Sequence, residues 1–533
     1  MTHVIEAREP LPADRAAEVH RGEEAVAGHL EDAAHFPGGK ADAIARPRSE
    51  GEIAALLFGA GHVLPIGAQS SVTGGATPTG GLLLSTDRLT RMDDAGPNHV
   101  RVGAGVPLEM LQARLRTSNR WYAPAPTFMG AFTGGVVATN AAGAATFKYG
   151  TTRSWVDGVT VVLPCGHVLD IERGTVRADP KRGFAIRCPH GERRFLPGSY
   201  TMPDVPKCSA GYFASPEMDL IDLFIGAEGT LGVIVDATLR VAPLPGATAL
   251  ALVPMTDEAS GLALVNELRE ASRQTWSSGD PCGIDVAAIE HLDRRCLAVL
   301  REDGIDRMQQ VNLAEGTGLL LLVQLELSGS RTAAQVYDDI AGAMSEEADS
   351  SIGRFCRRLW AYGALDRAEI AAPGDVRRTQ QFLALREGAP TGVNRRVGDA
   401  RRLVDARIDK TAADMIVPFD RFADLMVIYR EGYERRGLDY AIWGHISDGN
   451  VHPNVIPRSH ADVVKGREAI LEFGREVVSL GGSPLAEHGV GRSTIKQTLL
   501  RQLYGERGIE QMRAIKREID PDWKLAPGVI FQP

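Results

Sequence analysis

Three segments crowded with glycine and other small residues place the tightest limit on how this chain can fold. They read PIGAQSSVTGG (Pro65–Gly75), GAFTGGVVATNAAGAATFKYG (Gly130–Gly150) and IGAEGTLGVIVDATLRV (Ile225–Val241). Small side chains let the backbone approach a ligand closely, and consecutive N–H groups can then form an anion-binding concavity without a lysine. Taken alone, the first segment is more typical of a tight loop between strands. Three such segments together predict a large cofactor that lies extended over backbone.

None of these segments has the GxGxxG pattern of a nicotinamide-binding domain or the GxxxxGK[ST] pattern of a phosphate-binding loop. The sequence therefore indicates neither a Rossmann dehydrogenase nor a nucleoside triphosphatase.

The chain has 533 residues, too many for one hydrophobic core, so we expect several domains. Residues 1–40 are polar and predict an N-terminal helical segment. Short apolar runs separated by glycine-rich turns predict an α+β domain over 41–244, within which the basic stretch 175–215 resembles an excursion rather than core. Residues 245–490 predict an antiparallel sheet with helices on one face. Residues 491–533 predict helices that return to the first domain.

Charge and composition exclude several classes of protein. Lysine and arginine number 59 against 68 acidic residues, a net charge of −9, which disfavours nucleic-acid binding. No apolar run approaches the ~18–20 residues that span a bilayer, and the N-terminus does not resemble a secretory signal. We expect a cytoplasmic protein, with peripheral attachment to a membrane as the alternative.

The cysteines are scattered and lack CxxC spacing, which disfavours a disulfide framework or an iron–sulfur cluster. The six are Cys165, Cys188, Cys208, Cys282, Cys296 and Cys356.

The segment GHISDGNVHPN, residues 444–454, carries two histidines around an Asp-Gly pair. Asp-Gly between apolar runs predicts a hairpin with a two-residue loop, in which His445 faces His452. Directly opposed residues have Cβ atoms ~4.5–5.5 Å apart, so both imidazoles could bind one ion at ~2.0–2.1 Å. A cross-strand histidine pair with ordinary hydrogen bonds is the alternative, and a wider loop would remove this pairing.

A second polar motif favours the metal interpretation. In PLAEHGVGRSTIK, Glu487 stands beside His488 among small residues, and an adjacent acid and imidazole there are seldom both packing residues. Imidazole and carboxylate ligands suit Zn²⁺, Mn²⁺ or Fe²⁺, and the sequence does not distinguish these ions.

Together these motifs resemble the vanillyl-alcohol-oxidase (PCMH-type) superfamily of FAD-linked oxidases over about residues 41–531. The branch they resemble contains D-lactate dehydrogenases, D-2-hydroxyglutarate dehydrogenases and the flavin subunit of glycolate oxidase. The resemblance implies an α+β fold: a PCMH-type FAD-binding domain of two subdomains, and a substrate (cap) domain whose antiparallel sheet is covered by helices.

The resemblance also implies roles for individual residues. Because no histidine or cysteine stands at a tether position in these motifs, we expect FAD to be bound non-covalently. His445, His452 and Glu487 correspond to metal ligands, and His488 to the catalytic base. Arg386 and Lys410 would bind the substrate carboxylate, and Asn450 would orient the substrate. The residues expected at the cofactor are Pro65, Ile66, Gly67, Ala68, Gln69, Ser70, Ser71, Gly74, Gly75, Thr133, Gly134, Gly135, Asn140, Glu228, Gly229, Gly232 and Ile234.

The implied activity is the FAD-dependent, metal-assisted oxidation of a D-2-hydroxy acid, similar to D-lactate, to the 2-oxo acid. The metal would chelate the carboxylate and hydroxyl, His488 would take the hydroxyl proton, and hydride would pass to flavin N5. Electrons would then pass to an external acceptor: a quinone, a cytochrome or an electron-transfer flavoprotein. A homodimer is one assembly that this interpretation allows. The alternative is a non-redox FAD enzyme of the alkyl-glycerone-phosphate synthase type.

Overall fold

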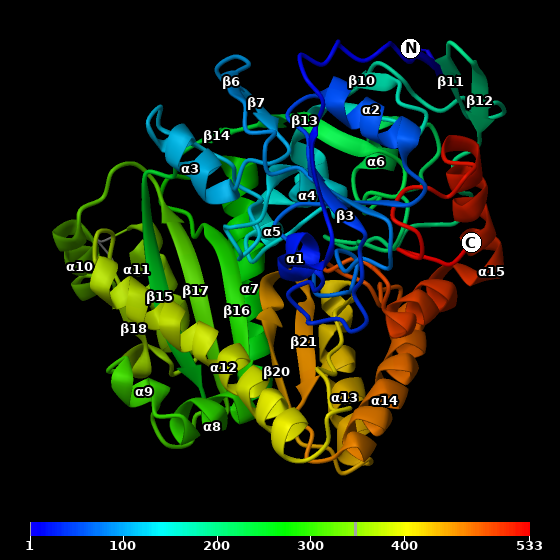
Figure 1. Ribbon diagram of the computed structural model, residues 1–533. Coiled ribbons are helices and arrows are strands. Elements are labelled where there is room, and N and C mark those ends of the chain that lie inside the picture. Colours follow the sequence, from blue (N-terminus) through cyan, green and yellow to red (C-terminus); the bar gives the residue numbers. More distant parts are fainter. Residues whose placement is uncertain (1, 346–348) are drawn as a thin grey trace. The chain divides into compact units, whose positions relative to one another are not determined.

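The chain forms two compact units in the computed structural model, which describes residues 2–345 and 349–533 (Figure 1). Unit 1 comprises Met1–Gly143, Gly150–Pro243 and Ser483–Pro533. Unit 2 comprises Ala144–Tyr149 and Leu244–Gly482. The chain therefore leaves unit 1 twice, briefly after Gly143 and then from Leu244 to Gly482.

Unit 1 is built on three principal sheets. A five-stranded sheet has the order β10-β9-β13-β7-β6, a four-stranded sheet the order β2-β3-β5-β4, and a three-stranded sheet the order β1-β11-β12. The strands are β1 (Val4–Glu6), β2 (Glu18–Arg21), β3 (Ala43–Arg46), β4 (Val63–Ile66), β5 (Leu82–Ser85), β6 (Met92–Asp94), β7 (His99–Gly103), β9 (Val156–Val162), β10 (Val168–Glu172), β11 (Phe184–Cys188), β12 (Gly191–Phe195) and β13 (Val233–Arg240). The short strands β8 (Arg120–Trp121) and β14 (Ala242–Pro243) pair with each other.

These sheets differ in strand direction. In the four-stranded sheet, β5 pairs in parallel with both β3 and β4. In the five-stranded sheet every pairing is antiparallel, with Ile234 of β13 opposite Val161 of β9. Two separate sheets within one unit fit the two-subdomain FAD-binding fold that the family resemblance implies.

Short helices connect the strands of unit 1. They are α1 (Glu23–Val26), α2 (Glu50–Gly59), α3 (Leu108–Arg116), α4 (Thr133–Ala138) and α6 (Ile221–Phe224), followed near the end of the chain by α15 (Thr494–Ile519). The sequence sets their ends locally: Ser49 caps α2 by accepting a hydrogen bond from the Glu52 N–H.

The prediction of a helical N-terminal segment over residues 1–40 was wrong. Its β1 and β2 are strands, and helical structure is confined to α1 and a 3₁₀ turn at Ala27–His29. β1 pairs with β11 and β2 with β3, so partners far along the chain outweigh the local helix preference of this polar segment.

The stretch 175–215 is not purely an excursion. Its first half forms β11 and β12, but residues further along are buried, including Lys207, Ala210 and Tyr212. A lysine and a tyrosine in a polar stretch are ordinarily exposed, and here other parts of unit 1 cover them.

Unit 2 is built on one seven-stranded sheet with the order β18-β15-β17-β16-β20-β21-β19. All of its pairings are antiparallel, as the sequence predicts. The strands are β15 (Ala247–Met255), β16 (Val286–Asp293), β17 (Leu319–Leu327), β18 (Glu369–Ala371), β19 (Met415–Ile416), β20 (Tyr440–His445) and β21 (Asn450–Val455). Its helices are α5 (Thr146–Tyr149), α7 (Glu258–Ser278), α8 (Arg294–Glu302), α9 (Ile305–Met308), α10 (Ala333–Ala341), α11 (Ser351–Ala361), α12 (Val376–Leu403), α13 (Phe422–Glu434) and α14 (His460–Ser479).

Helices cover both faces of this sheet, whereas the sequence analysis expected them on one. Leu250 and Leu252 of β15 pack into a core with Phe382 of α12, which crosses in front of the strands in Figure 1. On the opposite face, Gly261 of α7 lies against Leu319 and Met255. Strand β17, LLLLVQLEL, is buried at almost every position because neither of its faces meets solvent.

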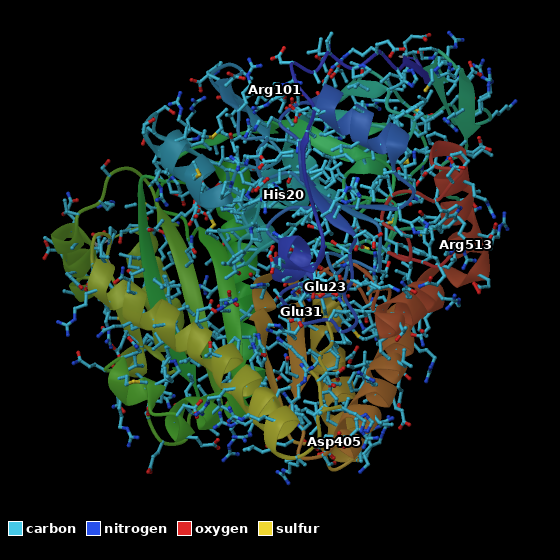
Figure 2. The ribbon with its side chains drawn as sticks, in the orientation of Figure 1. His20, Glu23, Glu31, Arg101, Asp405 and Arg513 are labelled. Carbon is cyan, nitrogen blue, oxygen red and sulfur yellow. The ribbon has the colours of Figure 1, made fainter. Side chains whose placement is uncertain are left out.

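Ionisable side chains lie at the surface of each unit, among them the exposed His20, Glu23 and Arg101 in unit 1 and the half-buried Asp405 in unit 2 (Figure 2). Within the described residues, no helix combines the length and the apolar character that crossing a membrane requires.

The core of unit 2 yields a stability prediction. Phe382 is 0% exposed in this core, so Phe382→Ala should lower the free energy of unfolding by about 3–5 kcal/mol through lost burial and a cavity. Its neighbour on α12, Leu383, is 46% exposed, and Leu383→Ala should change that free energy by less than about 0.5 kcal/mol. Urea unfolding of both variants measures the difference, and equal effects would contradict this description of the core.

Candidate functional site

Unit 1 contains a cavity of about 360 Å³ at the small-residue segments. All three segments line it, together with the Glu487–His488 pair. The lining residues are Pro65, Ile66, Gly67, Ala68, Gln69, Ser70, Ser71, Val72, Gly75, Ala76, Thr86, Pro126, Thr127, Phe128, Ala131, Phe132, Gly134, Gly135, Val136, Ala138, Thr139, Ala141, Ala142, Glu228, Gly229, Gly232, Val233, Ile234, Glu487 and His488. Five separate regions of the sequence therefore meet around one cavity whose size is typical of a ligand site.

Three of the residues predicted at the cofactor do not line this cavity but shape its wall. Thr133 is buried, and its hydroxyl donates to the Val106 carbonyl at 2.9 Å at the start of α4. Gly74 has φ of 75° and donates its N–H to Asp32 at 2.7 Å. Asn140 accepts a hydrogen bond from the Arg153 N–H at 2.9 Å. Their roles are to fix the backbone around the cavity.

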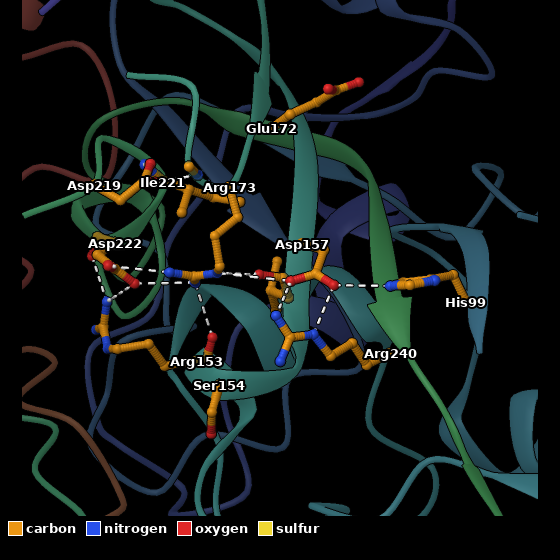
Figure 3. A network of polar contacts seen from close by, with 12 residues as sticks. His99, Arg153, Ser154, Asp157, Glu172, Arg173, Asp219, Ile221, Asp222 and Arg240 are labelled. Carbon is orange, nitrogen blue, oxygen red and sulfur yellow. Dashed lines mark hydrogen bonds and ion pairs between the residues drawn. The ribbon is translucent and has the colours of Figure 1, made fainter. Parts of the chain in front are cut away.

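The wall is held by a half-buried arginine, Arg153, which Figure 3 shows within a network of ion pairs. Its guanidinium donates to the carbonyl oxygens of Asp222 and Ile225, each at 2.6 Å. Burial lowers the pKa of Arg153, while the nearby Asp222 carboxylate favours the charged form. Arg173 joins the network by donating to the Arg153 carbonyl at 2.9 Å and to Asp222.

The segment that follows Ile225 is fixed to α4 by its own backbone. Gly226 donates to the Val137 carbonyl at 3.1 Å and Glu228 to the Ala138 carbonyl at 2.8 Å. Gly226 has φ of 86°, a backbone conformation that residues with a side chain rarely adopt, whereas a Cβ atom there would make only ordinary contacts with Arg153 and Asn140. Glycine is therefore required where these two small-residue segments meet.

Glu228 is expected at the cofactor, and the structure gives it a second role. Its carboxylate accepts hydrogen bonds from the N–H groups of Val490 and Gly491 at 2.8 and 2.9 Å. Burial raises its pKa, and these two donors oppose the rise. Glu228 thus ties the loop after His488 to the cavity wall.

Glu487 and His488 lie together at the edge of the cavity. One Glu487 oxygen accepts a hydrogen bond from the Lys207 ammonium at 2.6 Å, and the other lies 3.4 Å from His488 Nε2. The side chain of Lys207 is 0% exposed and that of Glu487 is 8% exposed, whereas His488 is 36% exposed. A fixed carboxylate therefore lies beside a more accessible imidazole.

Gly135 in the cavity wall and Arg492, which lies outside the lining but interacts with the lining residue Glu228, indicate the ligand. Gly135 lines the cavity, and a Cβ atom at that position would meet no protein atom within 4 Å, because the glycine faces open space. Arg492, whose N–H donates to the Thr73 carbonyl at 3.0 Å, has buried guanidinium nitrogens with no hydrogen-bond partner among the described residues. Burial lowers its pKa to about 10. A flat group against Gly135 and an anionic group near Arg492, as in FAD, fit these features.

Sequence reasoning missed several residues of this site. The turn at Pro126–Phe128 and Phe132 line the cavity, but a proline–phenylalanine turn carries no specific cofactor signal. Lys207 lies 280 positions before its partner Glu487, and only the fold brings them together. Arg492 could have been noticed, since it follows the GVG of the Glu487 motif.

In unit 2, the predicted two-residue hairpin was wrong. Residues Ile446–Asp448 form a 3₁₀ turn and Gly449 has φ of 86°, so the loop is wider than Asp-Gly alone. His445 therefore pairs with Asn450, and His452 pairs with Trp443.

His445 and His452 nevertheless share a face of the sheet as diagonal neighbours. Their ring centroids are 5.8 Å apart and their planes are nearly perpendicular.

Each of these imidazoles has a carboxylate at its Nδ1 atom. Glu290 Oε2 lies 3.1 Å from His445 Nδ1, and Asp414 Oδ1 lies 3.7 Å from His452 Nδ1. Metal-binding histidines commonly direct one ring nitrogen to a carboxylate and the other to the metal. The two side chains therefore fit a divalent cation, although their surroundings also suit a hydrogen-bonded pair.

Arg386 belongs to the same buried polar cluster, since it donates to Glu290 at 3.0 Å. Burial opposes its charge, but Glu290 and Glu387 hold the pKa of the guanidinium above its usual range. Burial raises the pKa of Glu290. The nearby His445 and Arg386 lower it by more, so the pKa of the Glu290 carboxyl lies well below its ordinary value.

Lys410 and Asn450 complete the predicted residues of unit 2. Burial lowers the pKa of Lys410. Asn450 donates to the Met415 carbonyl at 2.9 Å and to Asp414 at 3.4 Å, so it orients the acid beside His452.

Comparison with known families finds a matching family for each of two regions of the chain. Residues 254–530 match the family described as FAD linked oxidases, C-terminal domain, and residues 41–172 match an FAD binding domain. The chain belongs to the FAD-linked oxidases. It is therefore an FAD-dependent oxidoreductase, and the two matched domains confirm the resemblance found in the sequence.

Several curated relatives of this FAD-linked oxidase match nearly its whole length. A D-lactate dehydrogenase of Archaeoglobus fulgidus is 26% identical, covering 92% of this chain and 91% of the relative. The glycolate oxidase subunit GlcD of Bacillus subtilis is 25% identical over 92% of this chain and 89% of its own. A D-2-hydroxyglutarate dehydrogenase of Xanthomonas citri is 27% identical over the same shares, 92% and 89%.

Among solved structures, an alkyldihydroxyacetonephosphate synthase has a similar fold. Its TM-score is 0.58 at 13% identity, covering 98% of this chain and 89% of its own. This likeness supports the PCMH-type fold.

The open space at Gly135 gives a prediction about cofactor binding. Gly135→Val would place methyl groups in the cavity, so the purified protein should retain much less flavin per chain. Gly61→Val is the matched control, because a Cβ at Gly61 also meets no protein atom but Gly61 does not line the cavity. Flavin absorbance relative to protein measures both, and full flavin content in Gly135→Val would place the cofactor elsewhere.

Proposed function

We propose that this FAD-linked oxidase oxidises a D-2-hydroxy acid, similar to D-lactate, to the corresponding 2-oxo acid. The observation that carries the proposal is that His488, paired with Glu487, lines the same cavity as the small-residue segments. An imidazole there would be within reach of a substrate placed against the cofactor. The names of the curated relatives, D-lactate and D-2-hydroxyglutarate dehydrogenases, support this substrate class.

In this proposal His488 accepts the proton of the substrate hydroxyl. Imidazole is suited to this role near neutral pH. Glu487 lies 3.4 Å from His488 Nε2 and would orient the imidazole, and Lys207 keeps that carboxylate in place. Bound FAD supplies a two-electron acceptor for the substrate carbon. FAD would be held non-covalently by the small-residue segments.

The substrate carboxylate would be bound by Arg386 and Lys410. Arg386 is already held by Glu290, so its guanidinium is oriented before a substrate arrives. Because burial lowers the pKa of Lys410, an anionic partner would stabilise its charged form.

We further propose that His445, His452 and Glu487 bind a divalent cation, with Asn450 orienting the surroundings. A cation bound there would supply positive charge that favours ionisation of the substrate hydroxyl. The carboxylates at both Nδ1 atoms support this role, and the ligand types suit Zn²⁺, Mn²⁺ or Fe²⁺. Electrons would pass to an external acceptor: a quinone, a cytochrome or an electron-transfer flavoprotein. A homodimer is a possible active form.

The fold likeness to an alkyldihydroxyacetonephosphate synthase favours one second candidate, a non-redox FAD enzyme. Such an enzyme would stay yellow in the presence of hydroxy acids. The 25–27% identity to curated dehydrogenases and an oxidase subunit over about nine-tenths of the chain favours oxidation.

The role of His488 can be tested directly. With an artificial dye as acceptor and D-lactate as substrate, His488→Gln should lower kcat by about 10²–10⁴-fold because proton removal loses its base. Flavin content should not change. His35→Gln, an exposed histidine in the same unit, is the control. A His488→Gln enzyme with wild-type kcat would remove this residue from the proposed chemistry.

The cation can be tested separately. Chelation with EDTA and His452→Ala should each lower the rate of flavin reduction by D-lactate, and added Mn²⁺ or Zn²⁺ should restore only the chelated wild type. His460→Ala, on helix α14 of the same unit, should behave as wild type. If chelated wild type and His452→Ala both keep the full rate, no cation takes part.

A further inference from the structure

Two copies of a Cys-x-His pattern, Cys165-Gly166-His167 and Cys188-Pro189-His190, lie in different turns of unit 1. The first lies in the turn from β9 to β10, and the second in the turn from β11 to β12. The ligand atoms of Cys165, His167 and Cys188 all lie within 4.8 Å of one another. The His190 ring lies beside them, 5.4 Å from the His167 ring between centroids.

These separations match a tetrahedral metal site. His167 Nδ1 lies 3.4 Å from Cys165 Sγ. In a tetrahedral zinc site with Zn–S of about 2.3 Å and Zn–N of about 2.1 Å, the nitrogen and sulfur would be roughly 3.6 Å apart. Two imidazoles on such an ion would have ring centroids roughly 5 Å apart. The ligand atoms of Cys165, His167 and Cys188 therefore need little movement to meet one ion, and the exposed His190 beside them would reach it by rotation of its side chain.

A carboxylate supports the ring of His167 from the opposite side. Glu9 Oε1 lies 3.2 Å from His167 Nε2, while the other ring nitrogen, Nδ1, faces Cys165. This is the carboxylate–histidine arrangement that orients metal-binding imidazoles. The side chain of His167 is 6% exposed, so the ring is held in this position.

The surrounding backbone makes the site rigid. Leu163 and His167 close the β9–β10 turn by a 2.8 Å hydrogen bond, and Gly166 within it has φ of 86°. In the second turn Cys188 pairs with Gly191 across β11 and β12. The N-terminal segment reaches the first turn because Arg8 and Val168 exchange backbone hydrogen bonds at 2.9 Å. Three segments distant in sequence thus converge on the sulfur and nitrogen atoms.

We propose that Cys165, His167, Cys188 and His190 bind a structural Zn²⁺ ion. Two thiolates and two imidazoles form a closed tetrahedral set that leaves no position for a substrate, as structural zinc sites require. Soft thiolate ligands also favour zinc over the oxygen-preferring cations. The ion would fasten the β11–β12 hairpin and the N-terminal segment to the five-stranded sheet. This site shares no residue with the cation proposed at His445, His452 and Glu487.

Metal analysis of the full-length holoprotein, purified under reducing conditions and supplied with Zn²⁺, tests the proposal. Wild type should contain about one zinc equivalent per chain that both Cys165→Ser and His190→Asn lack. Cys282→Ser, a partly buried cysteine of unit 2, should keep it. Because His190 is exposed, His190→Asn should fold even where Cys165→Ser does not.

Replacement of the ion by Co²⁺ separates this site from the catalytic cation. A thiolate-bound, tetrahedral Co²⁺ gives a sulfur-to-metal charge-transfer absorption, which a site of imidazole and carboxylate cannot give. This band should persist in His452→Ala and disappear in His190→Asn. Its persistence in His452→Ala also keeps this test independent of the proposed activity.

Two outcomes would overturn the proposal. One is equal zinc content in wild type, Cys165→Ser and His190→Asn. The other is a disulfide between Cys165 and Cys188 whose reduction in the presence of Zn²⁺ leaves the metal content unchanged. Thiol titration of the unfolded protein before and after reduction detects that bond.

Discussion

The cofactor cavity depends on the hydrogen bonds that the guanidinium of Arg153 donates. This guanidinium donates to the carbonyl oxygen of Asp222 (Figure 3) and to that of Ile225, while the Arg153 backbone N–H donates to the Asn140 side chain. These contacts bring two glycine-rich segments together without placing a side chain in the cavity. From there Glu228 extends the same framework to Val490 and Gly491, immediately after the Glu487–His488 pair. A half-buried arginine thus positions the backbone, and the backbone positions the imidazole that we propose as the base.

Unit 2 relies on buried charges in a different way. Glu290 accepts from Arg386 and faces His445, and Asp414 faces both His452 and Asn450. A buried carboxylate without partners would destabilise the folded protein. Here a guanidinium or an imidazole beside each acid reduces that cost. The same contacts fix the orientation of the groups that we propose to meet the substrate. Stability and preorganisation therefore come from one network.

Much of this organisation could be predicted from the sequence. The small-residue segments identified the cavity because only glycine and similar residues allow such close backbone contacts. The hairpin register could not be predicted, since Asp448-Gly449 suits a two-residue loop and the chain instead forms a 3₁₀ turn. Nor could the pairing of Lys207 with Glu487, because it depends on the whole fold of unit 1. The two Cys-x-His pairs could not be recognised as a metal site, because each pair alone is too short to be a metal-binding motif. Only the folded arrangement of distant strands brings the two pairs together.

The measurement that tests the account most directly is anaerobic mixing of the purified protein with each enantiomer of lactate while the flavin absorbance is followed. The account predicts that the D enantiomer bleaches the flavin and that the L enantiomer does so far more slowly. A panel of larger D-2-hydroxy acids extends the test to other side chains. A protein that stays yellow with every hydroxy acid would contradict oxidation of this substrate class and favour the non-redox chemistry.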